Sequence, residues 1–208
     1  MLAARFAALS LFLLAGFARA EAPPPAAPPP VPSVALPVIP DDEARVELAR
    51  VLAYAKRYDE ALAEYRLALA ARPTDTALKV EYGEVLGWAG RADEARAALG
   101  ALPPESLTPA AATLLADLLV GQDKFAEAAA LYRRVLAAAP ADHAARFKLA
   151  RVLAFQKDHD GALAEFDRIL AAVPGDIQVR RHRAQVLGWA GRPAEAAAEW
   201  RRTLPAAP

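Results

Sequence analysis

The stretch VLAYAKRYDEALAEY, from Val51 to Tyr65, recurs as VLAFQKDHDGALAEF from Val152 to Phe166, which is 101 positions later. The heptapeptide VLGWAGR at Val85 to Arg91 returns at Val186 to Arg192 with the same offset. Apolar residues in these stretches recur at steps of three and four, and Ala and Leu are abundant, which predicts amphipathic helices. The chain therefore contains a duplicated helical block with a further segment between the two copies.

A shorter period underlies the duplication. Pro140, Pro174 and Pro208 are spaced by 34, and Pro73 precedes Pro140 by 67, one step of 34 and one of 33. Small residues share this register, with large ones four positions later: Ala61, Ala95, Ala128, Ala162 and Ala196, then Tyr65, Leu99, Tyr132, Phe166 and Trp200. Each proline ends a helix, and a nearby Asp or Thr can cap the next. Five helix-turn-helix units are predicted, at 42–75, 76–108, 109–142, 143–176 and 177–208.

This pattern resembles the tetratricopeptide repeat (TPR) family, whose first helix carries a Leu-Gly or Leu-Ala pair. The matching pairs are Leu48-Ala49, Tyr82-Gly83, Leu115-Ala116 and Leu149-Ala150. The resemblance implies an all-α, right-handed superhelical solenoid whose concave face is lined by the first helices. Two departures stand out. The second unit has Pro103-Pro104 early, which shortens its second helix, and the fifth has Arg183 where the family prefers a large apolar residue.

Two N-terminal segments do not belong to the predicted solenoid. Residues 1–20 have the basic start, apolar stretch and small-residue cleavage site of a secretory signal peptide, the alternative being an uncleaved anchor that would bring membrane contact. Residues 21–40 hold nine of the 18 prolines and are predicted to form a stiff, proline-rich disordered linker. This linker is either a tail without a ligand or a docking site for a proline-reading module.

Charge and cysteine content restrict the class of protein. The whole chain has 25 basic and 25 acidic residues, and cleavage after Ala20 would leave 23 basic residues against 25. Such a balance argues against a nucleic-acid partner, which requires a basic surface. Cysteine is absent. Together with the export signal and the abundance of Ala and Arg, this predicts a periplasmic protein of a Gram-negative bacterium.

The sequence gives little support for an enzyme. His143, His159 and His182 lie in different units, without a second His or Cys at metal-ligand spacing. Beyond the signal peptide the serines are Ser33 in the linker and Ser106 in a loop. No glycine-rich phosphate loop is present. We therefore predict a non-enzymatic protein with no catalytic residues, no metal and no cofactor.

The resemblance places candidate binding residues on the concave face. The thirteenth position of the five first helices reads Tyr54, Trp88, Gly121, Phe155 and Trp189. Aromatic rings there could contact peptides or the faces of sugars, or instead pack sideways into the next unit. The ninth position reads Arg50, Glu84, Asp117, Arg151 and Gln185. Arg180, Arg181, His182 and Arg183 form a basic cluster that is either a solvated helix face or a contact for an acidic partner, in which case Arg181, at a fifth position, is expected to face the groove.

These residues leave three functional hypotheses open. In the first, the chain is a periplasmic scaffold for protein or peptide partners of an envelope assembly or exopolysaccharide secretion machine, to whose repeat variants it is similar. In the second, the aromatic stripe binds a glycan. In the third, the last unit, with Ala197, Trp200 and Leu204, docks onto a partner or a second copy. Alternatively, Glu195, Glu199, Arg201 and Arg202 face outward and cap that unit.

Overall fold

A computed structural model describes residues 39–205, so the predicted signal peptide and nearly all of the predicted linker lie outside the described residues. Within this range the chain is all-α, as predicted. The elements are α1 (Asp41–Tyr54), α2 (Tyr58–Ala71), α3 (Thr76–Trp88), α4 (Ala92–Gly100), the 3-10 helix η1 (Pro104–Ser106), α5 (Pro109–Val120), α6 (Phe125–Ala138), α7 (His143–Phe155), α8 (His159–Ala172), α9 (Ile177–Trp189) and α10 (Pro193–Arg201).

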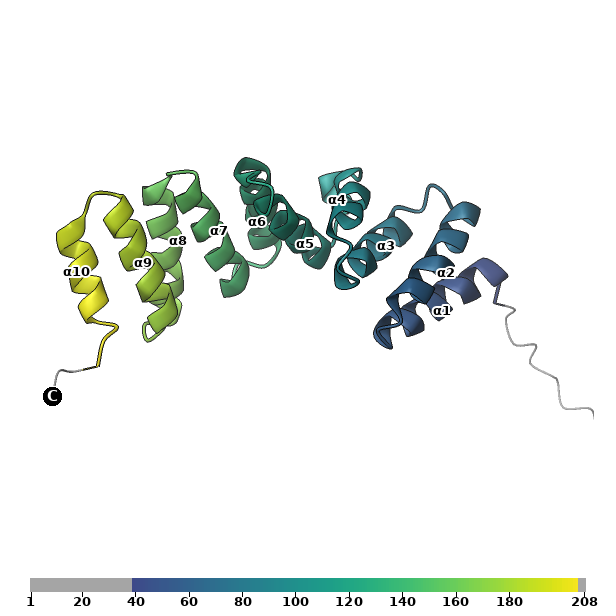
Figure 1. The fold of residues 1–208 in the computed structure, drawn as a ribbon, viewed down its shortest axis with the longest axis horizontal. Helices are drawn as coiled ribbons and strands as arrows, with labels where there is room; N and C mark the ends of the chain where they lie inside the picture. Colours follow the sequence, from purple (N-terminus) through teal and green to yellow (C-terminus); the bar gives the residue numbers. More distant parts are fainter. Residues whose placement is uncertain (1–38, 206–208) are drawn as a thin grey trace, which may run out of the picture. The chain divides into compact units, whose positions relative to one another are not determined.

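The helices pack in chain order. Each odd-numbered helix pairs with the helix that follows it, and each pair contacts the next through α2 and α3, α4 and α5, α6 and α7, or α8 and α9 (Figure 1). The five pairs are the five repeats of the solenoid. Because contacts run only between elements close in the chain, every repeat buries its apolar surface against its neighbours.

Side-chain caps explain where the first helices begin. Asp75, Asp142 and Asp176 each accept a hydrogen bond at 2.9 Å from the backbone N–H three residues ahead, at the starts of α3, α7 and α9. Thr108 does the same for α5 at 3.0 Å. These are the Asp and Thr residues that follow the proline breaks, and each satisfies a backbone donor that the helix leaves free.

The heptapeptide VLGWAGR contributes both to the buried core and to the turn between the two helices of its repeat. Its Val and Leu are buried in both copies. Its second Gly occupies the turn into the second helix, with a positive φ of 75° at Gly90 and 71° at Gly191. The same turn position in the other repeats is also left-handed, at Lys56, Asp123 and Lys157. Glycine adopts this conformation without a Cβ penalty, so VLGWAGR carries the less strained version of the turn.

In the core of each of the first four helix pairs, the second helix contributes a small residue followed by a large residue four positions later. Ala61, Ala95, Ala128 and Ala162 are fully buried, as are the large side chains four positions later at Tyr65, Leu99, Tyr132 and Phe166. The buried residues form two clusters, one from Val46 to Ala95 and one from Val80 to Ala196. The division falls in the second repeat, where α4 has nine residues against 14 in α2, α6 and α8. Pro103-Pro104 thus shortens this helix as predicted.

Candidate functional site

Two pockets occupy equivalent places in the duplicated block, and every residue that lines one has its counterpart 101 positions away in the other. The first has a volume of about 240 Å³ and is lined by Arg50, Ala53, Tyr54, Tyr65, Glu81, Glu84, Val85 and Trp88. The second has a volume of about 310 Å³ and is lined by Arg151, Ala154, Phe155, Phe166, His182, Gln185, Val186 and Trp189. We call them the N-terminal pocket and the C-terminal pocket.

An ion-pair network fixes the polar wall of the N-terminal pocket. Arg50 donates two hydrogen bonds to Glu81, at 2.9 Å and 2.6 Å, and a third to Glu47 at 2.5 Å. The hydrogen bonds to Glu81 raise the pKa of Arg50 above its ordinary value. The Tyr65 hydroxyl also donates to Glu81, at 3.1 Å, and burial together with this carboxylate raises the pKa of Tyr65. Glu84 accepts a hydrogen bond from the Thr108 hydroxyl at 2.7 Å.

The C-terminal pocket is lined by residues at the equivalent positions, but these residues carry a different charge. His182 and Gln185 replace the two glutamates, so Arg151 faces an imidazole instead of a carboxylate. No carboxylate among residues 39–205 lies within ion-pair distance of Arg151, whose guanidinium lies 5.9 Å from the Phe155 ring centroid. The lining of the N-terminal pocket therefore carries a net negative charge, and that of the C-terminal pocket a net positive one.

The four aromatic residues at the thirteenth position combine the two geometries that the sequence left open, namely exposure toward a ligand and sideways packing into a neighbouring unit. Tyr54 is 92% exposed, Trp88 57%, Trp189 49% and Phe155 45%. Phe155 packs against Phe125 with ring centroids 5.4 Å apart, so this ring is held from one side. All four residues line a pocket, and each has at least 45% of its surface exposed.

The central repeat separates the pockets with its own polar cluster. The Tyr132 hydroxyl donates to Asp117 at 2.5 Å, and Lys148 of the following repeat contacts the same carboxylate at 2.6 Å. Burial and the hydrogen bond to Asp117 raise the pKa of Tyr132. Asp117 lines neither of the two pockets, because Gly121 supplies no ring beside it.

Arg181 is not among the residues that line the C-terminal pocket. Its counterparts at the fifth position of the first two repeats, Val46 and Val80, are buried in the core clusters. Thr113, Phe147 and Arg181 at the same position are half-buried, so the fifth position is not uniformly part of the core, and the orientation of Arg181 toward the groove stays a prediction. The neighbouring arginines have structural partners: Arg180 contacts Glu199 at 2.7 Å, and Arg183 contacts Asp167 at 2.7 Å.

The last repeat exposes apolar residues, and the prediction that Glu199 belongs to an outward-facing capping surface is wrong. Trp200 is 41% exposed and Leu204 61%, while Ala197 is half-buried. Glu199 does not face outward as expected, because it is only 3% exposed and binds Arg180, Arg183 and Arg202. Arg183 in place of an apolar residue thus has a buried carboxylate to neutralise it. Docking of a partner or a second copy on this repeat stays a prediction.

Glu81 and His182 line the pockets but were not among the concave-face binding residues predicted from the sequence. Both occupy the sixth position of a first helix, 31 residues after Arg50 and Arg151 respectively. Both could have been identified from the separation of 31 residues between the ninth position of one first helix and the sixth position of the next first helix. Among the described residues, no cluster of three or more His, Cys, Asp and Glu side chains could hold a metal ion. No helix within residues 39–205 combines the length and apolarity needed to cross a membrane.

Comparison with protein families gives two matches, both described as tetratricopeptide repeat. One covers residues 52–118 and the other residues 113–177. Together they extend over residues 52–177, more than half of the chain, and overlap at residues 113–118, within α5 of the third repeat. Comparison with curated protein sequences yields no match.

Several solved structures have the same arrangement of helices. One is YrrB, described as a TPR protein with an unusual peptide-binding site, which is 18% identical with a TM-score of 0.71 over 78% of this chain and 84% of its own. A structure of MamA is 19% identical with a TM-score of 0.69, covering 78% of this chain and 90% of its own. Another, of MamA AMB-1, is 23% identical with a TM-score of 0.68, covering 78% and 89%. At such identities the likeness concerns the fold alone.

Proposed function

Because the chain belongs to the tetratricopeptide repeat family, whose stacked helix pairs form protein-interaction scaffolds, we propose that it holds one extended polypeptide partner across its two equivalent pockets. The observation that carries this proposal is the residue-for-residue correspondence of the two linings at an offset of 101. A pair of pockets with aromatic walls suits two anchor side chains of one partner, since aromatic residues provide large and rigid contact areas. No catalytic step enters this proposal.

The charges of the pockets define which anchors they accept. Glu81 and Glu84 favour a basic or amide-bearing side chain in the N-terminal pocket, whereas Arg151 favours an acidic side chain in the C-terminal pocket. Equivalent pockets are three repeats apart, roughly 30 Å if neighbouring first helices are ~10 Å apart. An extended segment spans this distance with about nine residues. We therefore propose a partner with a basic anchor and an acidic anchor separated by about that length.

We place this function in the periplasm, on the signal-peptide composition of residues 1–20. The proposed setting is an envelope assembly or exopolysaccharide secretion machine, on the similarity of the repeat sequences to those of such systems. Cell fractionation of a tagged full-length chain tests the location. Recovery in the cytoplasmic fraction without N-terminal processing would contradict it.

A crosslinking pull-down from the native envelope tests the binding proposal. The test variant replaces Tyr54, Trp88, Phe155 and Trp189 with Ala, and circular dichroism checks that it remains helical. The matched control replaces exposed apolar residues outside the two pockets and outside the last repeat, Leu67 and Val173, with Ala. We expect the test variant to lose partners that wild type and control retain. Equal recovery by all three proteins would remove the pockets from the binding surface.

A glycan is the second candidate ligand, and the half-exposed Trp88 and Trp189 side chains favour it because a flat ring can stack on a sugar face. A Trp200→Phe background leaves these two tryptophans as the fluorophores of the chain. Titration with envelope oligosaccharides should then quench or shift their emission in a saturable manner. Unchanged emission at millimolar oligosaccharide would eliminate the glycan and leave the polypeptide.

A further inference from the structure

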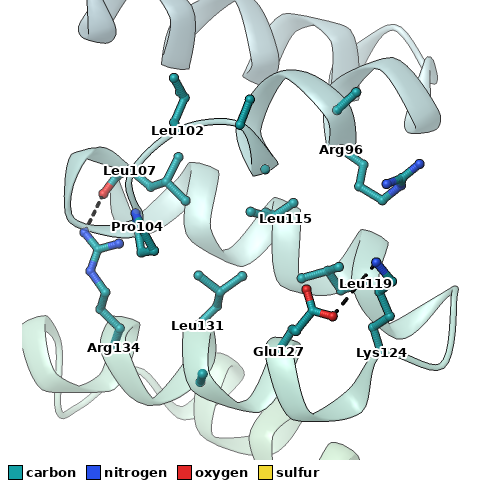
Figure 2. Close-up of a pocket in the computed structure, with 14 residues that line it drawn as sticks. Arg96, Leu102, Pro104, Leu107, Leu115, Leu119, Lys124, Glu127, Leu131 and Arg134 are labelled. Atoms are coloured by element: carbon teal, nitrogen blue, oxygen red, sulfur yellow. Dashed lines mark hydrogen bonds and ion pairs between the residues drawn. The ribbon is translucent and has the colours of Figure 1, made fainter.

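The shortened α4 leaves space that the second helices of other repeats fill with their last turns. After Gly100 the chain turns away at Pro103-Pro104, forms η1, and returns to the core only at Leu107, which is buried. The result is a pocket of about 580 Å³ between α4, η1, α5 and α6 (Figure 2). It shares no lining residue with the N-terminal or the C-terminal pocket.

The floor of this pocket is aliphatic. Its leucines are Leu102, Leu107, Leu115, Leu119 and Leu131, joined by alanines and Pro104. Leu102 is only half-buried, whereas its counterparts Val135 and Ile169 in repeats with a full second helix are almost completely buried. Apolar surface that the fold covers elsewhere therefore stays open here. A volume of this size falls in the range of roughly 300 to 1,000 Å³ that small-molecule sites occupy.

Two of the three cationic side chains that line the pocket lie at one of its ends, beside the carboxylate of Glu127. Figure 2 shows Arg96 and Lys124 together beside Leu119. Their ion pairs are long, 3.8 Å from Arg96 to Asp93 and 3.9 Å from Lys124 to Glu127, so neither forms a hydrogen bond. The Nε of Arg96 also has no hydrogen-bond partner among the described residues.

The opposite end offers a different environment. There Arg134 donates a hydrogen bond at 3.1 Å from Nη2 to the carbonyl of Leu107, while its Nη1 has no hydrogen-bond partner among the described residues. Pro104 and Leu107 form the apolar boundary beside it (Figure 2). The pocket thus has an aliphatic body, two cationic side chains at one end and one partly paired cationic side chain at the other.

We propose that this pocket binds a free anionic amphiphile, an alkyl chain with one carboxylate. The carboxylate lies between Arg96 and Lys124, and the chain follows Leu119, Leu115 and Leu131 toward Pro104. A carboxylate supplies acceptors for the two cations, and the alkyl chain lies on the aliphatic floor, where Leu102 is half-buried and the other leucines are nearly covered. This site is independent of the proposed function and can exist whether or not the other two pockets bind a polypeptide.

Calorimetric titration of the mature chain with monomeric sodium dodecanoate tests the site. We expect saturable binding of one molecule, and much weaker binding of dodecyltrimethylammonium, which has the same chain and the opposite charge. Lys124→Glu should weaken dodecanoate binding about tenfold, since it replaces a charge-assisted contact with a repulsive one. Arg133→Glu makes the same charge change on an exposed residue outside the pocket and should leave the affinity unchanged.

A second variant tests the apolar part of the site. A Cβ at Gly100 meets no atom within 4 Å, so the position accepts a side chain, and Gly100→Phe is chosen to place a ring over the pocket that Gly100 lines. We expect this variant to keep its helix content and to lose dodecanoate binding. Equal affinity in wild type, Lys124→Glu and Gly100→Phe would overturn the proposal. So would cosedimentation with phosphatidylglycerol vesicles in the absence of dodecanoate binding, because that result indicates adsorption to a charged membrane surface.

Discussion

Two buried phenols, Tyr65 and Tyr132, tie the second helices to acidic residues on the first helices. Each is almost fully buried, and each donates its hydroxyl hydrogen to a carboxylate, Glu81 or Asp117. Burial is the main reason that the pKa of both phenols is raised, and the carboxylates add to it. Folding therefore favours the protonated form of these side chains.

This preference predicts a loss of stability in alkali. Above pH ~10 the unfolded chain releases the two phenolic protons while the folded chain retains them, so the free energy of unfolding falls as pH rises. The double variant Tyr65→Phe, Tyr132→Phe should show a smaller fall between pH 9 and 11 than wild type, measured by urea denaturation. Tyr54→Phe, which alters an exposed phenol, serves as the control. An identical slope in all three proteins would contradict the prediction.

At the scale of the helix pair, the second repeat is packed differently from the others. Gly83 takes the place that Ala49, Ala116, Ala150 and Ala184 occupy in the other first helices. A Cβ at Gly83 would lie 2.4 Å from Cδ2 and 2.6 Å from Cγ of Leu99, which is fully buried. The absence of a side chain thus lets α4 approach α3 closely, and Leu99 fills the space that a tyrosine or phenylalanine fills elsewhere.

Gly83→Ala should therefore destabilise the protein by about 1 to 3 kcal/mol, despite the better helix propensity of alanine, because the added methyl overpacks the pair. Gly188→Ala is the matched control: it also lies in a first helix, but its Cβ meets no atom within 4 Å. We expect it to stabilise the protein by up to about 1 kcal/mol. Urea denaturation monitored by circular dichroism measures the sign of the change in the free energy of unfolding for each variant. Equal changes in the two variants would show that helix propensity, and not packing, determines the effect of the substitution at Gly83.

Much of this level of structure could be predicted from the sequence. Proline breaks and the register of Ala61 with Tyr65 are local signals, repeated often enough to predict helix pairs. The pocket beside α4 could not, because it depends on where Leu107 re-enters the core after Pro103-Pro104. The outward placing of Glu199 was wrong because its burial follows from Arg180 and Arg183, whose direction the sequence alone does not give. The side-chain pairs between successive repeats could not be predicted either, because they depend on the stagger between neighbouring helices.

The solenoid as a whole contains two apolar cores, and they meet in the second repeat. The smaller core involves α1 to α4, while the larger runs from α3 to α10. In a linear array, stability comes from each repeat and from its interface with the next, so a weak interface separates regions that unfold at different denaturant concentrations.

Hydrogen exchange at increasing urea should reveal this division. We expect amides of α1 and α2 to lose protection at lower urea than those of α6, α7 and α8, since the latter belong to the larger core. The fifth repeat, with its exposed Trp200, provides an internal comparison for ordinary fraying at an end. A single transition shared by all helices would show that the interface between α4 and α5 is as strong as the others.

The ion pairs between successive first helices have a consequence for folding. Near-identical repeats in one chain offer similar apolar faces and can dock on the wrong neighbour. Here Arg50 meets Glu81, whereas Asp117 meets Lys148, so the same contact is made with opposite signs. Docking α7 on α1 would set Lys148 against Arg50, and docking α3 on α5 would set Glu81 against Asp117. Like-charge repulsion therefore disfavours these two wrong orders among those that the apolar faces alone would permit.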